Sequence, residues 1–279
     1  MSVVDAFWEL PPIARTVTAA AFSMSVLVYT HVLPYSWIMF TWQQFLQLPP
    51  QLWRLPTSFL LTGPSLGMLF DPFMLYRGLV ELEMGNSRFR SKEDVVWYLI
   101  CVALMTIGFN ELGLYLGLSN VYATFLPGFL IALTYTTSQD KRGQQASLFF
   151  FTIPAQLMPY ALILMGFLQD PNSGMYMLPL QIAGILAAHT YDFATRLWPE
   201  FGRGRNLLPT PGFVSVFTTT PRFLQGRFTP GPGRAGGQRL GGGGATGSGV
   251  GVGRSTGVSL GSGPLPDSWR TRGPGQRLG

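Results

Sequence analysis

The chain has 279 residues, of which 47% are hydrophobic and 11% charged, against about a quarter charged residues in an ordinary soluble domain. A mean hydropathy of +0.26 over this length argues against a soluble globular protein. Two histidines and one cysteine exclude a disulfide framework and argue against a Cys/His metal site, so we expect neither a metal nor a cofactor.

Charge and glycine content divide the chain into two parts. Residues 1–202 hold 9 basic and 12 acidic residues, a net charge of −3, whereas residues 203–279 hold 10 arginines and one acid, a net charge of +9. Of the 34 glycines, 21 follow residue 202. A chain of the second composition cannot bury enough apolar surface to offset the entropy lost on ordering. We therefore predict a membrane domain over residues 1–202 and a disordered cytosolic Gly/Arg-rich tail over residues 203–279.

The first part contains six long apolar runs, and a membrane-spanning helix needs about 20 mostly apolar residues. In chain order the predicted spans are 15–37, 57–80, 95–116, 121–138, 147–168 and 175–197. The pattern predicts an all-α membrane protein with six transmembrane helices.

Basic residues in the short loops indicate the orientation of these spans, because cytosolic loops are enriched in Lys and Arg. They lie after the second, fourth and sixth spans or at their ends, at Arg88, Arg90, Lys92, Lys141, Arg142, Arg196, Arg203 and Arg205. The opposite loops at 119–120 and 169–174 contain no basic residue. We therefore expect both termini to lie in the cytosol.

The first loop, residues 40–56, alternates aromatic and apolar residues with glutamines and ends at Trp53 and Arg54. This mixture is typical either of an aromatic belt or of a loop that is embedded in the membrane and disturbs the lipid. We expect Trp53 and Arg54 to be the most sensitive residues of the membrane part. A structural role in holding the loop is weighed slightly ahead of direct contact with a substrate.

Several spans carry polar residues or prolines. The carboxyl group of Asp71 in the second span is expected to pair with Arg77, and Asp192 with Arg196 one helical turn later. In the sixth span Gly184 and Ala188 form a small-xxx-small pattern, which lets two helices approach closely.

The order of these features resembles the Derlin family, the rhomboid-like pseudoproteases of the endoplasmic reticulum, over roughly residues 5–202. The resemblance is carried by Pro11-Pro12-Ile13-x-Arg15-Thr16, Trp53-Arg54-Leu55-x-Thr57, Leu75-Tyr76-Arg77, Glu81-Leu82-Glu83, Gly184-x-x-x-Ala188-His189-x-Tyr191 and Trp198-Pro199. Ala188 departs from the family by replacing the second glycine of the sixth-span pattern. The resemblance implies a rhomboid-like six-helix bundle.

An active rhomboid needs a serine in a Gly-rich turn of the fourth span and a histidine in the sixth. His189 lies in the sixth span, but the interior of the fourth contains no serine. We therefore expect a non-catalytic protein, with His189 serving packing and hydrogen bonding. An active intramembrane protease and a small-molecule transporter are the alternatives.

The tail carries one short sequence twice, Gly237-Gln238-Arg239-Leu240-Gly241 and Gly275-Gln276-Arg277-Leu278-Gly279, the second preceded by Trp269 and Gly273. Both copies resemble the SHP box by which Derlins, here of fungal type, bind the AAA ATPase valosin-containing protein. An aromatic anchor and an Arg-Leu pair suit a linear peptide that docks on a folded domain. Nonspecific binding of RNA or anionic lipid by the basic tail is the alternative, and we expect no nucleic-acid partner.

By resemblance, the protein would act in ER-associated degradation in the endoplasmic reticulum membrane, helping to move misfolded proteins to the cytosol. The implied partners are this ATPase, a membrane ubiquitin ligase complex, misfolded and ubiquitylated substrates, and the lipid bilayer. Homo- or hetero-oligomers are also expected.

Overall fold

The computed structural model of the chain describes residues 7–85, 89, 91–141, 143–148, 151–169, 171–202, 204 and 206–218. These residues all belong to the first of two contact units, Met1–Phe228. The tail motifs that begin at Gly237 and at Trp269 lie outside the described residues.

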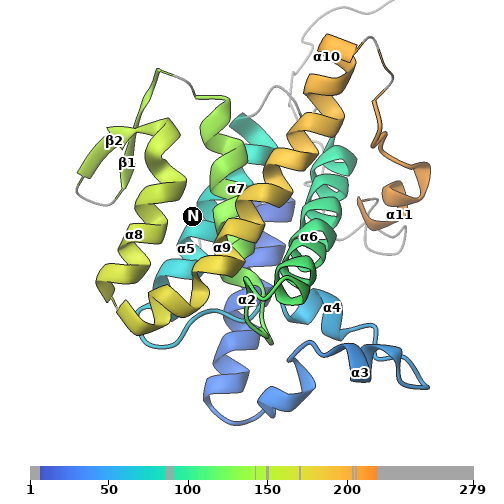
Figure 1. The fold of residues 1–279 in the computed structure, drawn as a ribbon, viewed down its shortest axis with the longest axis vertical. Coiled ribbons are helices and arrows are strands. Elements are labelled where there is room, and N and C mark those ends of the chain that lie inside the picture. The colour runs from blue at the N-terminus through green and yellow to red at the C-terminus, as the bar shows by residue number, and fades with distance from the viewer. Residues whose placement is uncertain are drawn as a thin grey trace, which may run out of the picture. The chain divides into compact units, whose positions relative to one another are not determined.

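Long helices dominate this part of the chain, and short helices, a hairpin and π-helical turns connect them (Figure 1). The α-helices are α2 (Pro12–Tyr29), α3 (Trp42–Leu46), α4 (Arg54–Thr57), α5 (Gly67–Val80), α6 (Lys92–Tyr115), α7 (Leu126–Gln139), α8 (Met158–Gln169), α9 (Pro171–Asp192), α10 (Trp198–Gly202) and α11 (Ser215–Thr218). The strands are β1 (Gln145–Leu148) and β2 (Phe151–Pro154). Single 3₁₀ turns occupy Tyr35–Trp37, Ala155–Leu157 and Gly212–Val214, and π-helical turns follow α5 at Glu81–Gly85 and α9 at Phe193–Leu197.

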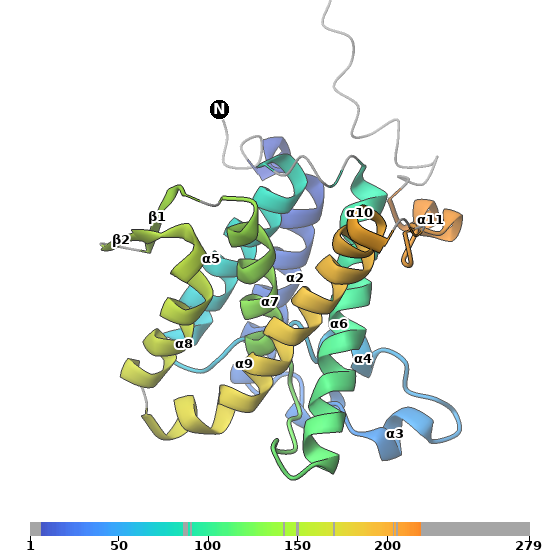
Figure 2. The same ribbon diagram turned by 45° about the horizontal axis from the view of Figure 1, so that its top comes forward.

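Helix α7 lies at the centre, where it packs against α9, α8 and α5. Figures 1 and 2 show α7 beside α9, with α8 and the hairpin on one side and α6 on the other. Most of its residues are buried, including Leu126, Leu130 and Leu133. The hydroxyl groups near its end, such as that of Ser138, donate to carbonyls within the same helix. The apolar sequence and these local hydrogen bonds allow α7 to be covered on nearly all sides.

Two helix starts explain how the bundle is fixed at one end. Ser91 and Asp94 form a reciprocal capping box at the start of α6, with both hydrogen bonds at 3.2 Å. The start of α2 is capped from another element, because a carboxylate oxygen of Glu83 accepts from the backbone N–H groups of Ile13 and Ala14, each at 3.1 Å. The acidic turn after α5 therefore holds the beginning of α2.

The prediction of an all-α fold is wrong in one segment, which forms a β-hairpin. We expected a helix over 147–168, but β1 and β2 pair antiparallel, with Ser147 opposite Thr152, and the helix begins only at Met158. Pro154 ends β2 and precedes the 3₁₀ turn, where its fixed φ is compatible with the backbone. The hydropathy of this segment does not distinguish a short apolar strand pair from a helix.

The predicted helix over 57–80 is also interrupted. Residues between α4 and α5 take a non-helical path that includes Gly63 and Pro64 and a positive φ of 54° at Ser65. Asp71 Oδ2 accepts from Gly63 N at 2.7 Å, so the loop is tied back to the first turns of α5. In contrast, the runs 95–116 and 175–197 correspond closely to α6 and to α9 with its π-helical turn.

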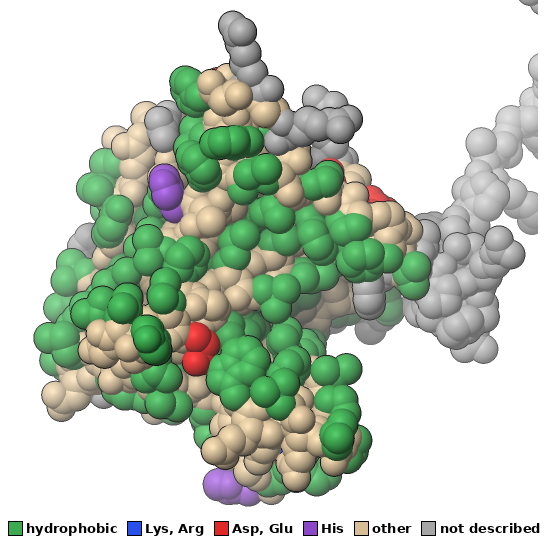
Figure 3. Space-filling view, turned by 45° about the vertical axis from the view of Figure 1, so that its right-hand side comes forward, with side chains coloured by type: hydrophobic (Ala, Val, Ile, Leu, Met, Phe, Trp, Pro, Cys, Tyr) green, Lys and Arg blue, Asp and Glu red, His purple; other side chains and the backbone are tan. Residues whose placement is uncertain are grey.

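Large apolar side chains cover much of the outer surface of these helices. Among the described residues, α2 and α6 are long and apolar enough to cross a membrane by length and composition, and Ala155–Leu168 is a shorter apolar helical stretch. The face in Figure 3 is mostly green and tan and shows no blue among its described residues. Exposed apolar side chains occur on each of α2, α5, α6, α8 and α9, for example Phe22, Phe73, Leu104, Leu164 and Leu186. Such a continuous apolar surface indicates a protein that lies against lipid or other membrane proteins.

Candidate functional site

Arg54 holds the first loop from the inside of the molecule. Its side chain is buried, with 4% exposed, and its Nη1 donates to the carbonyl oxygens of Ser36 at 2.6 Å and Met39 at 2.8 Å. Its Nε donates to Gln51 Oε1 at 2.5 Å. Trp53, in contrast, is 52% exposed and provides an apolar surface next to this anchor. The neighbouring residues therefore have different roles: Arg54 fixes the loop, and Trp53 faces outward.

The closest helix contact in the bundle joins α7 to α9. Gly184 lies against the backbone of Gly128, and a methyl group at Gly184 would collide with the carbonyl oxygen of Gly128. A methyl group at Gly128 would in turn lie 2.7 Å from the carbonyl oxygen of Leu180. Ala188, one turn after Gly184, is 1% exposed. Of the small residues predicted in the sixth span, Gly184 thus lies at a backbone-to-backbone contact, and Ala188 is buried one turn further along.

Sequence reasoning identified one side of this contact and missed the other. Gly128 follows Pro127 at the start of α7 and forms, with Ala132, a pattern of small residues four apart like that of Gly184 and Ala188. This second small-xxx-small pattern was the available signal, because it lets two helices approach closely.

His189 on α9 has its partner on α7. Its Nδ1 lies 3.1 Å from the hydroxyl oxygen of Tyr135, and the two rings meet edge to face. The histidine therefore takes part in hydrogen bonding between the fourth and sixth predicted spans.

A cleft opens between α5 and α8, with α7 and α9 behind it. We call it the α5–α8 cleft; it has a volume of about 160 Å³ and is lined by Asp71 and Met74 of α5, Leu130 of α7, Leu162 and Gly166 of α8, and Gln181 of α9, among others. Gln181 is 9% exposed, and its Oε1 is buried without a hydrogen-bond partner among the described residues. Asp71 uses Oδ2 for the bond to Gly63 N. Two polar side chains from different helices therefore line an otherwise apolar cleft.

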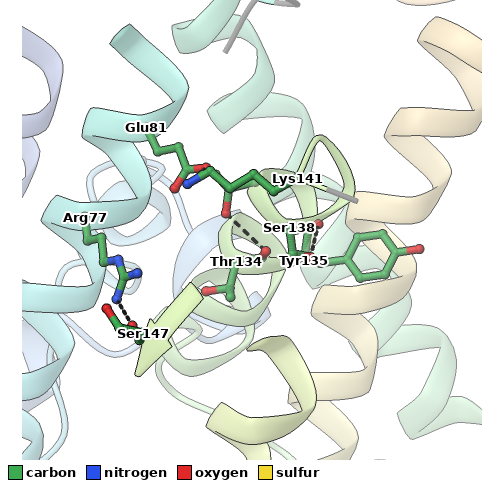
Figure 4. A network of polar contacts seen from close by, with 8 residues as sticks. Arg77, Glu81, Thr134, Tyr135, Ser138, Lys141 and Ser147 are labelled. Atoms are coloured by element: carbon green, nitrogen blue, oxygen red, sulfur yellow. Dashed lines mark hydrogen bonds and ion pairs between the residues drawn. The ribbon is translucent and has the colours of Figure 1, made fainter. Parts of the chain in front are cut away.

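The pairing expected for Asp71 with Arg77 is wrong. Arg77 lies further along α5, and its Nη1 donates to the carbonyl oxygen of Ser147 in β1 at 2.7 Å. Figure 4 shows this guanidinium directed at the hairpin, with the side chains of Lys141 and Glu81 nearby. Lys141 Nζ lies 2.8 Å from Glu81 Oε1. These contacts tie the hairpin and the end of α7 to α5, and they leave Asp71 in the cleft.

The expected pairing of Arg196 also involves another helix. Its Nη1 lies 3.8 Å from Asp140 Oδ1, at the residue that follows α7. The partner residue is distant in sequence, so spacing alone did not indicate it.

A segment beyond the predicted membrane domain packs back onto α6, which the boundary at residue 202 did not anticipate. Thr210 Oγ1 donates to Asp94 Oδ1 at 2.6 Å, and Thr218 Oγ1 donates to Glu93 Oε1 at 2.9 Å. The rings of Phe213 and Trp97 meet edge to face at 6.0 Å. The apolar Phe213 in a Pro- and Thr-containing sequence was the signal that part of this region could pack.

These observations define a membrane-associated helical protein with a close backbone contact between α7 and α9 and a cleft between α5 and α8 that contains polar groups. The sequence profile of the Der1-like family matches residues 10–212 of the chain. The chain therefore belongs to the Der1-like, or Derlin, family, whose members are rhomboid-like, inactive as proteases and connected with ER-associated degradation.

Two curated relatives support this assignment. Derlin-1.2 of Zea mays is 27% identical over 237 residues, which cover 84% of this chain and 91% of the relative. A probable derlin-2 homolog of Dictyostelium discoideum is 25% identical over 166 residues, which cover 59% of this chain and 63% of the relative.

Proposed function

We propose that the protein is a non-catalytic component of ER-associated degradation in the endoplasmic reticulum membrane. It helps misfolded proteins to pass from the membrane or lumen to the cytosol. The α5–α8 cleft carries this proposal, because it offers the polar groups of Asp71 and Gln181 beside an apolar outer surface. An extended or partly unfolded segment needs such groups when it leaves water.

The proposed membrane arrangement has six spans and both termini in the cytosol. The predicted spans correspond to α2, α5, α6, α7, α8 and α9, although only α2 and α6 reach the length and hydropathy expected of an isolated span. In this orientation the start of α5, the end of α8 and the cleft between them lie in the half of the membrane next to the lumen.

Short helices support a second part of the proposal, that the protein thins the bilayer around it. Helices α7 and α8 have 14 and 12 residues. At 1.5 Å per residue they measure about 21 and 18 Å, whereas a hydrocarbon core is about 30 Å thick. Lipid next to short helices becomes thinner, and this lowers the barrier for polar chain segments. Imaging of the protein in nanodiscs tests the idea, which fails if bilayer thickness beside α8 equals that of protein-free lipid.

The tail is proposed to recruit the AAA ATPase valosin-containing protein through its two SHP-like motifs, at Gly237–Gly241 and Trp269–Gly279. Two copies on one chain would raise the local concentration of motif for a hexameric partner. The double variant Leu240→Ala/Leu278→Ala keeps the charge of the tail, and we expect it to lose the ATPase in a pulldown. Retained ATPase binding that disappears at high salt would instead indicate nonspecific attraction to the arginines.

The wider assembly is proposed by family membership. A membrane ubiquitin ligase complex would receive the substrate, and oligomers of this chain or with related chains would enlarge the path. Deletion of the protein should cause particular ubiquitylated proteins to accumulate, and identifying them in membrane and lumenal fractions tests the proposed role.

Peptidase activity is not part of the proposal. His189 is hydrogen bonded to Tyr135, and the sequence offers no serine in the interior of the fourth predicted span. Cleavage of a transmembrane substrate by the purified protein, if abolished by His189→Ala, would reverse this conclusion. The six apolar runs show no internal repeat of the kind found in transporters, so small-molecule transport is not proposed either.

A further inference from the structure

Asp71 and Gln181 contribute different polar groups to the lining of the α5–α8 cleft. Asp71 supplies a carboxylate, of which Oδ2 accepts from Gly63 N, and no described residue donates to Oδ1. Gln181 supplies an amide whose Oε1 is buried without a partner among the described residues. The positive side chain predicted to neutralise Asp71, that of Arg77, is bonded to the hairpin instead. The cleft therefore presents hydrogen-bond acceptors and a negative charge, with their partner missing from the chain's own described residues.

The walls of the cleft around these groups are small or apolar. Gly166 of α8 has no side chain, and a methyl group placed there would lie 3.9 Å from Gln181 Nε2, at ordinary contact distance. The remaining lining is mainly apolar, with Met74, Leu130 and Leu162 around the two polar side chains. A cleft of about 160 Å³ has room for one polar side chain of an apolar helix that packs against α5 and α8.

Resting on the proposed function, we infer that the α5–α8 cleft selects transmembrane segments that carry a hydrogen-bond donor, above all a lysine or arginine, in the lumenal half of the bilayer. A cationic side chain in lipid is costly unless a partner neutralises it. Asp71 provides the opposite charge, and the Gln181 oxygen provides a second acceptor. Some membrane proteins carry a Lys or Arg in a span and depend on a partner subunit to neutralise it. Such a protein, once it has lost that subunit, would bind in this cleft in preference to a protein whose spans are wholly apolar.

The test uses the full-length chain in nanodiscs and synthetic transmembrane peptides. The peptides are identical leucine-rich helices with either Lys or Met at one position in the lumenal half, because Met has a similar length and no charge. A photo-crosslinking residue replaces Met165, which lines the cleft. The same residue at Leu104, an exposed position on α6, is the control for contact elsewhere on the surface.

We expect the Lys peptide to crosslink at position 165 about tenfold more strongly than the Met peptide, because charge-assisted hydrogen bonds are among the stronger polar contacts. The crosslinks at position 104 should be equal for the two peptides. Asp71→Asn keeps an acceptor oxygen for Gly63 N and removes the charge, so it should reduce the Lys peptide to the level of the Met peptide. Gln181→Leu should reduce the preference in part.

Three outcomes would overturn the inference, and they differ in what they imply for the proposed function. Equal crosslinking of both peptides at position 165 would show an entry site without this selectivity, and so would an Asp71→Asn variant that keeps the preference for Lys. Crosslinking of neither peptide at position 165 would remove the cleft as an entry site as well. Asp71→Glu restores the charge and is expected to recover preference for Lys, which separates selectivity from a general effect on folding.

Discussion

The α7–α9 contact and the α5–α8 cleft lie at opposite extremes of helix packing in one bundle. At the first, Gly128 and Gly184 bring two backbones together so closely that no side chain fits between them. At the second, a methyl group on Gly166 would meet the Gln181 amide only at ordinary contact distance, and the Gln181 and Asp71 side chains line a cavity. The same residue type thus closes one contact and opens another. A closely packed framework of α7 and α9 is thus distinct from the cleft that α5 and α8 line.

The largest expected effect comes from filling the closed contact. Gly184→Leu places a side chain against the Gly128 carbonyl, where the helices must move apart, and we expect it to cost about 3 kcal/mol or more of folding stability. Thermal unfolding of the purified protein in detergent measures the change.

Gly108 is the matched control, because it lies in helix α6 with nothing within 4 Å of a methyl group placed there. Gly108→Ala should leave stability unchanged or raise it by about 0.5–1 kcal/mol. Equal losses for the two glycine variants would show that the α7–α9 contact has no special role.

A second break in the framework removes the anchor of the first loop. Arg54→Ala leaves the carbonyls of Ser36 and Met39 without their buried donor, and we expect a loss of about 2–3 kcal/mol. Arg54→Lys should recover only part of it, since an ammonium cannot reproduce the fork of the guanidinium. Trp53→Ala, at a half-exposed position, should lose clearly less, as judged by unfolding and by protease resistance of the loop. A larger loss for Trp53→Ala would mean that lipid contact, and not Arg54, holds the loop.

Filling the α5–α8 cleft should have the opposite effect, with little change in stability and a loss of substrate contact. Gly166→Leu adds a side chain toward the cleft, and replacing a helical glycine should change stability only slightly, with a gain of up to about 1 kcal/mol. Crosslinking of substrate segments at Met165 should fall sharply, although the protein remains folded. A strongly destabilised Gly166→Leu would show that α8 packs as tightly as α9 and would remove the contrast between the two regions.

The smallest effect is expected where an ion pair joins the hairpin region to α5. Lys141 is 38% exposed and pairs with Glu81, so Lys141→Met should cost only about 0.5 kcal/mol. Unfolding measured at low and at high salt tests this, because the difference from the wild type should shrink as salt screens the pair. A difference that persists at high salt would point to lost packing of the lysine stem rather than to charge.

Sequence patterns predicted some elements well for physical reasons. The runs that became α6 and α9 are long, apolar and bounded by clear signals, such as Ser91 and Asp94 in a capping box before α6. Gly184 and Ala188 were recognisable because helix geometry places residues four apart on one face. The runs around Gly63 and Pro154 were misjudged, since hydropathy measures composition and is insensitive to the path of the backbone.

By itself, the amino-acid sequence determined that this protein has an apolar helical part and a basic Gly-rich part, because burial and solvation depend mainly on composition. It also determined the order of the helices and the small residues on one face of α9. The partners of these residues were decided only by the tertiary structure. Gly128 meets Gly184, Arg77 bonds to Ser147 rather than to Asp71, and Gln181 faces a cleft. Such contacts join residues far apart in the chain, and they exist because several helices pack at once.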